Sequence, residues 1–152
     1  MRTARVVIRT ASVCLLCLGL ARATDKLELD ETVPLENGAA DVKLEAGDIV
    51  LTKILVRDAP SEAEVAKAND KYHSYVNPTV VMSNKGRHDA DVELELTLQD
   101  EEGKEILSCS RSLEVEGKDE DNTYFACKRG RIKTLDWPRV KQAHVVAHIE
   151  ID

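Results

Sequence analysis

Histidines are the first side chains of this 152-residue chain whose type and spacing could hold a metal ion. His144 and His148 are four residues apart, and on a helix both imidazoles would share one face and could bind zinc. On a strand the same step covers about 13 Å, which is too far for two imidazoles to share one ion. Because VVAHIEI alternates apolar and polar residues, we expect a strand with both histidines facing solvent. We predict no metal site here, nor at His73 and His88.

The acidic segment EVEGKDEDNTY is a second candidate for metal binding, since calcium prefers several hard oxygen ligands. It lacks the D-x-D-x-D-G spacing of a dedicated calcium loop, and in a chain with 28 acids such runs arise readily. We interpret it as the solvated tip of a hairpin, with calcium binding near Asp119 as the open alternative. Its oxygen donors are Glu114, Glu116, Asp119, Glu120, Asp121 and Asn122.

Nucleophilic and phosphate-binding motifs are absent from the sequence. There is no G-x-S-x-G elbow, and the glycines after residue 23 lie singly rather than in a phosphate-cradling loop. The serines at 108, 110 and 112 alternate along one segment, as strand residues do. We therefore assign no catalytic residue and no cofactor, and expect a protein that is not an enzyme.

Aromatic side chains, which serve as stacking platforms in many binding sites, are few. The supply after residue 23 is Tyr72, Tyr75, Tyr124, Phe125 and Trp137. Trp137 precedes a proline and could lie exposed on a loop, so it is the one residue we single out as a binding candidate. Even so, for Trp137 we favour packing at the edge of the core over an exposed binding role.

The elements that would position these residues begin with the N-terminus. Residues 1–23 carry three early arginines, an apolar stretch and the small-residue sequence ARA, which is the order of a secretory signal peptide. The apolar stretch is shorter than the roughly 20 residues of a membrane-spanning helix. We predict a secreted or periplasmic protein, cleaved after Ala23, with no stable membrane insertion.

Cleavage would change both the charge and the cysteine count. Four of the 21 basic residues lie in 1–23 and none of the 28 acids, so 17 basic residues would remain and the net charge would be −11. Such a surface repels phosphate backbones, which argues against a nucleic-acid partner. Only Cys109 and Cys127 would remain, and in an oxidising compartment we expect a disulfide between them. It would tie a hairpin turning near Lys118 or, alternatively, join two sheets.

Period-two alternation predicts strands in DVELELTLQ, EILSCSRSLEV and AHVVAHIEID, and DIVLTKILVRD is a further strand rich in branched residues. KLELDETV and DVKL add short strands before it. PSEAEVAKANDK predicts one surface helix of about two and a half turns, because Ser61 and Glu64 form a capping box. One minor helix among many strands, with one disulfide, predicts an all-β antiparallel sandwich.

Three segments resemble the immunoglobulin-like β-sandwich domains of bacterial envelopes, especially the cell-adhesion-related CARDB type. They are DIVLTKILVRDAP, VNPTVVMSNKGRHDADVELELTLQDEEGKE and HVVAHIEI, within residues 48–152. The resemblance implies an immunoglobulin-like fold with a binding or scaffolding role and no catalytic residues. The chain departs from that type by its inserted residues 61–71, its cysteine pair, and the extension 24–47, which is either an addition or the first strands.

We therefore expect a binding module that contacts another protein or a cell-surface component. Two alternatives of other classes are a small metal-dependent or hydrolytic envelope enzyme and an inhibitor of a secreted enzyme. In the segment Asn84-Lys85-Gly86 we expect a turn in which Gly86 or Asn84 adopts positive φ.

Overall fold

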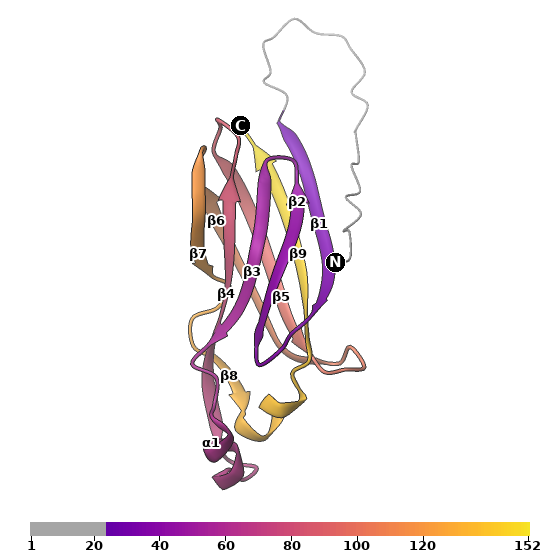
Figure 1. The fold of residues 1–152 in the computed structure, drawn as a ribbon, viewed down its shortest axis with the longest axis vertical. Coiled ribbons are helices and arrows are strands. Elements are labelled where there is room, and N and C mark those ends of the chain that lie inside the picture. The colour runs from indigo at the N-terminus through magenta and orange to yellow at the C-terminus, as the bar shows by residue number, and fades with distance from the viewer. Residues whose placement is uncertain (1–23) are drawn as a thin grey trace, which may run out of the picture.

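A computed structural model describes residues 24–152, and the predicted signal peptide lies outside the described residues (Figure 1). In chain order the elements are β1 (Asp25–Pro34), β2 (Ala39–Ala46), β3 (Ile49–Arg57), α1 (Glu62–Lys67), β4 (His73–Asn84), β5 (Ala90–Gln99), β6 (Glu105–Val115), β7 (Asp119–Phe125), β8 (Gly130–Lys133), the 3₁₀ helix η1 (Thr134–Arg139) and β9 (Gln142–Ile151). Within residues 24–152 no helix is long and apolar enough to cross a membrane.

The strands form two antiparallel sheets that pack face to face, so the predicted all-β sandwich is confirmed. One sheet has the order β1-β9-β5-β6, and the other has the order β2-β3-β4-β7, with β8 pairing with the first part of β4. In β5 and β9, alternate residues point into the core. In β5 these are Val92, Leu94, Leu96 and Leu98, each at most 2% exposed, as the alternation predicts.

The extension 24–47 supplies the first two strands of the sandwich. β1 pairs with β9 in unbroken register from Asp25↔Ile151 to Pro34↔Gln142. β2 pairs with β3, with one bulge between Asp41 and Leu44. Leu29 and Leu44 from these strands belong to the single buried core, so the extension completes the fold.

The expected hairpin between residues 105–115 and 119–125 is wrong. β6 pairs with β5 and β7 pairs with β4, so these consecutive strands lie in different sheets. Their connection is bonded to the loop after β4 instead: the N–H of Gly117 donates to Asp89 Oδ1 at 2.8 Å, and that of Lys118 to the Gly86 carbonyl at 2.7 Å. A Cβ on Gly117 would lie 2.6 Å from the Arg87 carbonyl oxygen, so the close approach requires glycine.

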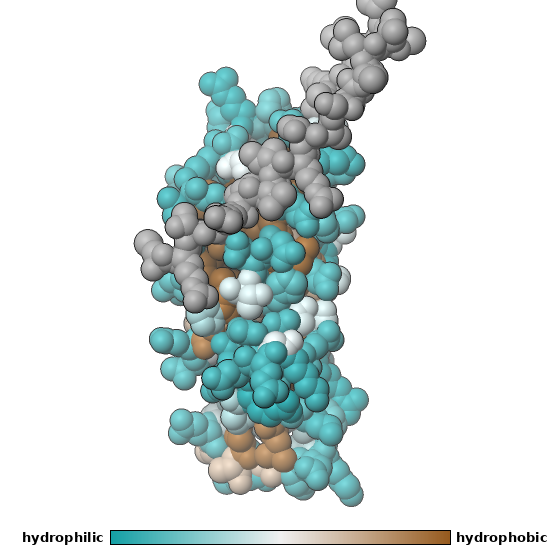
Figure 2. All heavy atoms as spheres, turned by 90° about the vertical axis from the view of Figure 1, so that its right-hand side faces the viewer, coloured by the Kyte–Doolittle hydropathy of each residue, from teal (hydrophilic) through white to brown (hydrophobic). Residues whose placement is uncertain are grey.

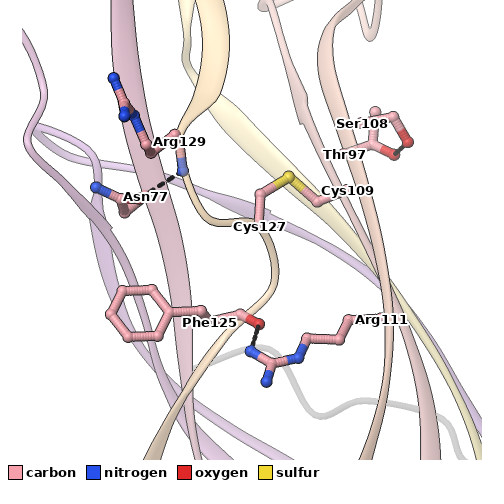
Figure 3. Close-up of a disulfide and its surroundings, with 8 residues drawn as sticks. All are labelled: Asn77, Thr97, Ser108, Cys109, Arg111, Phe125, Cys127 and Arg129. Atoms are coloured by element: carbon pink, nitrogen blue, oxygen red, sulfur yellow. Dashed lines mark hydrogen bonds between the residues drawn. A yellow bond between two sulfur atoms is a disulfide. The ribbon is translucent and has the colours of Figure 1, made fainter.

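The Cys109–Cys127 disulfide therefore joins the two sheets, which was the alternative to the hairpin (Figure 3). Cys109 is a buried residue of β6, and Cys127 follows β7. A second link lies nearby, where Arg111 Nη1 donates to the Phe125 carbonyl at 3.0 Å. Together they hold the edge strands β6 and β7 at a fixed separation.

The expectation of positive φ at Asn84 or Gly86 is also wrong, since neither is among the positive-φ residues. The side chain of Asn84 makes the turn: its Oδ1 accepts the Gly86 N–H at 2.9 Å, and its Nδ2 donates to the carbonyls of His88 and Val115. A Cβ on Gly86 would lie 2.8 Å from Asp48 Oδ2, so a larger residue there would require the Asp48 side chain to move.

Helix α1 has the predicted capping box but is shorter than expected. Ser61 Oγ accepts the Glu64 N–H, and the Glu64 carboxylate accepts the Ser61 N–H, which lowers the pKa of Glu64. The helix ends after Lys67, where Ala68 is extended. None of its residues is buried, so no packing favours a longer helix.

Replacing Ser61 with alanine should therefore melt α1 without unfolding the sandwich. We expect a cap loss of about 1 kcal/mol confined to the helix, and an unchanged urea midpoint for the whole domain. Hydrogen exchange at the amides of residues 64–68 measures the local effect. A matching fall in the global midpoint would show that α1 is coupled to the core.

Candidate functional site

The predicted histidine pair lies on a strand, as expected. His144 and His148 point outward from β9, and His144 Nε2 lies 2.6 Å from Asp30 Oδ1 of β1. His148 stands opposite Glu28 of β1 and Glu93 of β5. Across residues 24–152 no three His, Cys, Asp or Glu side chains converge to hold a metal ion.

The acidic segment is not a free tip. Asp119, Glu120 and Asp121 are the first residues of β7, and the connection from β6 is only residues 116–118. Because strand neighbours point to opposite faces, Glu120 points away from Asp119 and Asp121, so the three carboxylates do not converge on one point. The Asn122 side chain donates to Asp119, and Thr52 Oγ1 lies 3.4 Å from Asp121 Oδ1.

Trp137 lies in η1, half-buried against the edge of the core. Its ring packs on Gly38, where a Cβ would lie 2.8 Å from Trp137 Cη2. Gly38 has φ +75°, so this position suits glycine in both conformation and space. Trp137 therefore packs at the edge of the core, in the same element as the exposed Leu135.

Three large apolar side chains are exposed in residues 24–152, and all lie at one end of the molecule. Tyr72 and Tyr75 are 57% and 48% exposed at the start of β4, and Leu135 is 38% exposed in η1. The Tyr72 carbonyl accepts the Thr134 N–H at 3.1 Å, which brings β4 and η1 together. Figure 2 shows apolar surface at the lower end, where Figure 1 places α1. We call Tyr72, Tyr75 and Leu135 the apolar tip.

Four basic side chains flank the apolar tip, in the segment KRGRIK. They are Lys128, Arg129, Arg131 and Lys133, all exposed. The segment contains no acid, and none of the four makes an ion pair with a residue of 24–152. Residues 24–152 carry a net charge of −11, so these four residues form a locally positive cluster in an otherwise acidic region. We call these four residues the basic rim.

Two residues of the basic rim pack on aromatic rings. The Arg129 guanidinium lies 4.8 Å from the centre of the Tyr75 ring, and Lys128 Nζ lies 5.7 Å from that of Phe125. Arg131 is the β8 partner of Tyr75. These contacts fit cation–π attraction and leave the charged groups without a carboxylate partner.

The basic rim is positioned by two residues of β4, Asn77 and Pro78. Pro78 has no N–H to donate, and it lies between the part of β4 that pairs with β7 and the part that pairs with β8. The connection from β7 to β8 passes this point, where Asn77 Oδ1 accepts the Arg129 N–H at 2.7 Å (Figure 3). The Nδ2 of Asn77 donates to Asp58. Asp58 and Arg129 both have positive φ, so Asn77 anchors two strained loop residues.

A charged contact holds η1 on the other side. Arg139 bridges Asp136 in η1 and Asp100 in the β5–β6 turn, both at 3.1 Å. The pKa of the Asp100 carboxyl is lowered, chiefly by the Lys104 N–H and also by Arg139 and the Glu102 N–H. The charged Asp100 carboxylate therefore stabilises the turn at pH values above the range in which carboxyl groups ordinarily titrate. This stabilisation is lost as the pH falls through the lowered pKa.

Sequence reasoning identified Trp137 but missed the tip and the rim beside it. The run of four basic residues in KRGRIK was the available signal. The proximity of Tyr75 to Arg129 was not, because it depends on β8 folding back onto β4. No model of a known protein family matches this chain, and no curated protein matches it in sequence.

Proposed function

We propose that this protein is a secreted or periplasmic, non-catalytic binding module that uses its apolar tip and basic rim to hold an acidic protein partner. One observation carries the proposal: the three exposed large apolar side chains of residues 24–152 lie at the same end of the molecule as four basic side chains that make no ion pair, one of which packs on Tyr75. The resemblance to envelope immunoglobulin-like domains supports the binding role, and the inter-sheet disulfide supports an oxidising compartment.

The chemistry of the surface favours a protein over an anionic membrane. Tyrosine and arginine are enriched among the residues that contribute most to protein interfaces. The net charge of −11 over residues 24–152 opposes approach to an anionic bilayer, whereas a protein segment can meet the rim alone. The expected partner surface therefore carries carboxylates around one or two apolar side chains.

Charge reversal at the rim should remove binding. Tagged residues 24–152, with the disulfide formed, are used to capture partners from native envelope and secreted fractions, and affinity for the purified partner is then measured. We expect the double variant Arg131→Glu with Lys133→Glu to weaken binding by roughly tenfold or more. We expect a similar loss from the double variant Tyr72→Ser with Tyr75→Ser. Rising salt should also weaken wild-type binding, because the rim contacts are electrostatic.

The matched control is Lys85→Glu with Lys104→Glu, which makes the same change in net charge at exposed positions outside the rim. This control should bind like the wild type. If the control, the rim variant and the tip variant are all folded and bind equally well, the proposal is contradicted. Binding of wild type to vesicles containing an anionic phospholipid, with no protein captured, would assign the surface to membranes instead.

A further inference from the structure

The sheet edges of a sandwich carry unpaired backbone groups, and three of the four long edge strands here are protected against pairing with another chain. β1 carries five charged residues in Asp25–Glu31 and ends at Pro34. β2 is interrupted by its bulge, beside Lys43. β7 begins with three consecutive acids.

The central part of β6 has none of these protections, and its two glutamates, Glu105 and Glu114, lie at or near its ends. From Ile106 to Leu113 it carries one charged side chain, Arg111, which is bonded to the Phe125 carbonyl. Its register with β5 is regular from Ala90↔Val115 to Leu98↔Leu107. Beyond that pairing, no backbone hydrogen bond within residues 24–152 uses a group of Glu105–Glu114. Its outer edge is therefore a regular, nearly neutral strand edge.

We propose that this edge pairs with the same edge of a second copy, so that two four-stranded sheets join into one eight-stranded sheet. A two-fold axis makes the two β6 strands antiparallel, and each residue then meets a fixed partner across the axis. The proposal is independent of the apolar tip and basic rim.

The sequence of β6 is complementary to itself in one register. Ser110 is the midpoint of Glu105–Val115, so centring the axis there pairs the whole strand. In that register Leu107 meets Leu113 of the second copy, and Cys109 meets Arg111. Moving the axis to Arg111 would place two guanidinium groups opposite each other, and moving it to Cys109 would set Leu107 against Arg111.

The outward face of β6 also suits this pairing. Ser108, Ser110 and Ser112 are small, neutral and exposed. They separate the glutamates at 93 and 95 of one copy from those of the other by three strand spacings, about 14 Å. That separation exceeds the Debye length of about 8 Å at physiological salt, so repulsion between the two acidic faces is largely screened.

Cysteine cross-linking tests both the dimer and its register. Ser110→Cys should cross-link to itself, because residue 110 faces its own copy across the axis. Ser108→Cys alone should not, but mixed with Ser112→Cys it should give a cross-linked heterodimer. Peptide mapping confirms that Cys109–Cys127 is intact. Cross-linking of Ser108→Cys to itself as fast as Ser110→Cys would overturn the register.

Analytical ultracentrifugation of unmodified residues 24–152 over a wide concentration range tests association itself. We expect a reversible monomer–dimer equilibrium. Ser110→Lys should shift it to monomer, since two lysines would then face each other, while Ala63→Lys, at an exposed position of α1 outside β6, should leave it unchanged. A wild-type protein that stays monomeric throughout, or a Ser110→Lys variant that dimerises equally, would overturn the proposal.

Discussion

Removing the disulfide by replacing Cys109 and Cys127 with alanine should lower the free energy of unfolding by about 3 kcal/mol. The bond closes a loop with a sequence separation of 18 residues, and its loss enlarges the conformational freedom of the unfolded chain. Because it also joins the two sheets, we expect the β6 and β7 edges to show the largest rise in hydrogen exchange. Urea unfolding followed by circular dichroism measures the global change.

A matched control is Ser110→Ala with Ser112→Ala, two exposed changes on the same strand, for which we expect a change below about 0.5 kcal/mol. A reducing agent should destabilise the wild type to the level of the double cysteine variant and leave that variant unaffected. Two alkylatable thiols in the unreduced wild type would contradict the assignment.

The second large loss of stability is expected on replacing Asn84, which is 1% exposed. Asn84→Leu keeps a side chain of similar size but removes the donors to the carbonyls of His88 and Val115, at 2.9 and 3.1 Å. Leaving buried acceptors without partners costs about 1–3 kcal/mol each, so we expect a loss of about 3 kcal/mol in the free energy of unfolding.

Hydrogen exchange separates this mechanism from a general packing defect. The Gly86 N–H loses its acceptor on Asn84 directly, and the Lys118 N–H, which donates to Gly86, should lose protection with it. Asn122→Leu is the control, since Asn122 is exposed on β7 and its loss should cost below about 0.5 kcal/mol. A stability loss no larger than that of the control would show that the Asn84 amide does not hold the turn.

Much of the fold was predictable because its signals are local. The alternation of β5, β6 and β9 and the capping box at Ser61 each lie within a dozen residues, and each was found. The helix length was overestimated, because a cap can start a helix but only packing sustains it in a short segment. The role of Asn84 was missed for a related reason: its partners at 88 and 115 meet only in the folded chain.

The candidate site was less predictable than the fold. Trp137 was chosen from its neighbourhood in sequence, and it lies in η1, the element that also carries Leu135 of the apolar tip, but it is half-buried. Whether an aromatic side chain is covered depends on what packs above it, and here Gly38, a hundred residues earlier in the chain, receives the indole ring. Tyr72 and Tyr75 remain exposed because β8 runs beside them and not over them.

The residues by themselves determined which segments are strands, because period and composition are properties of the chain alone. Only the tertiary structure decided which strands are neighbours. β6 and β7 adjoin in sequence yet lie in opposite sheets, while β1 and β9, from the two ends of the described region, pair along their whole length. Strand pairing is settled by which arrangement buries all the apolar faces at once, and that is a property of the whole core.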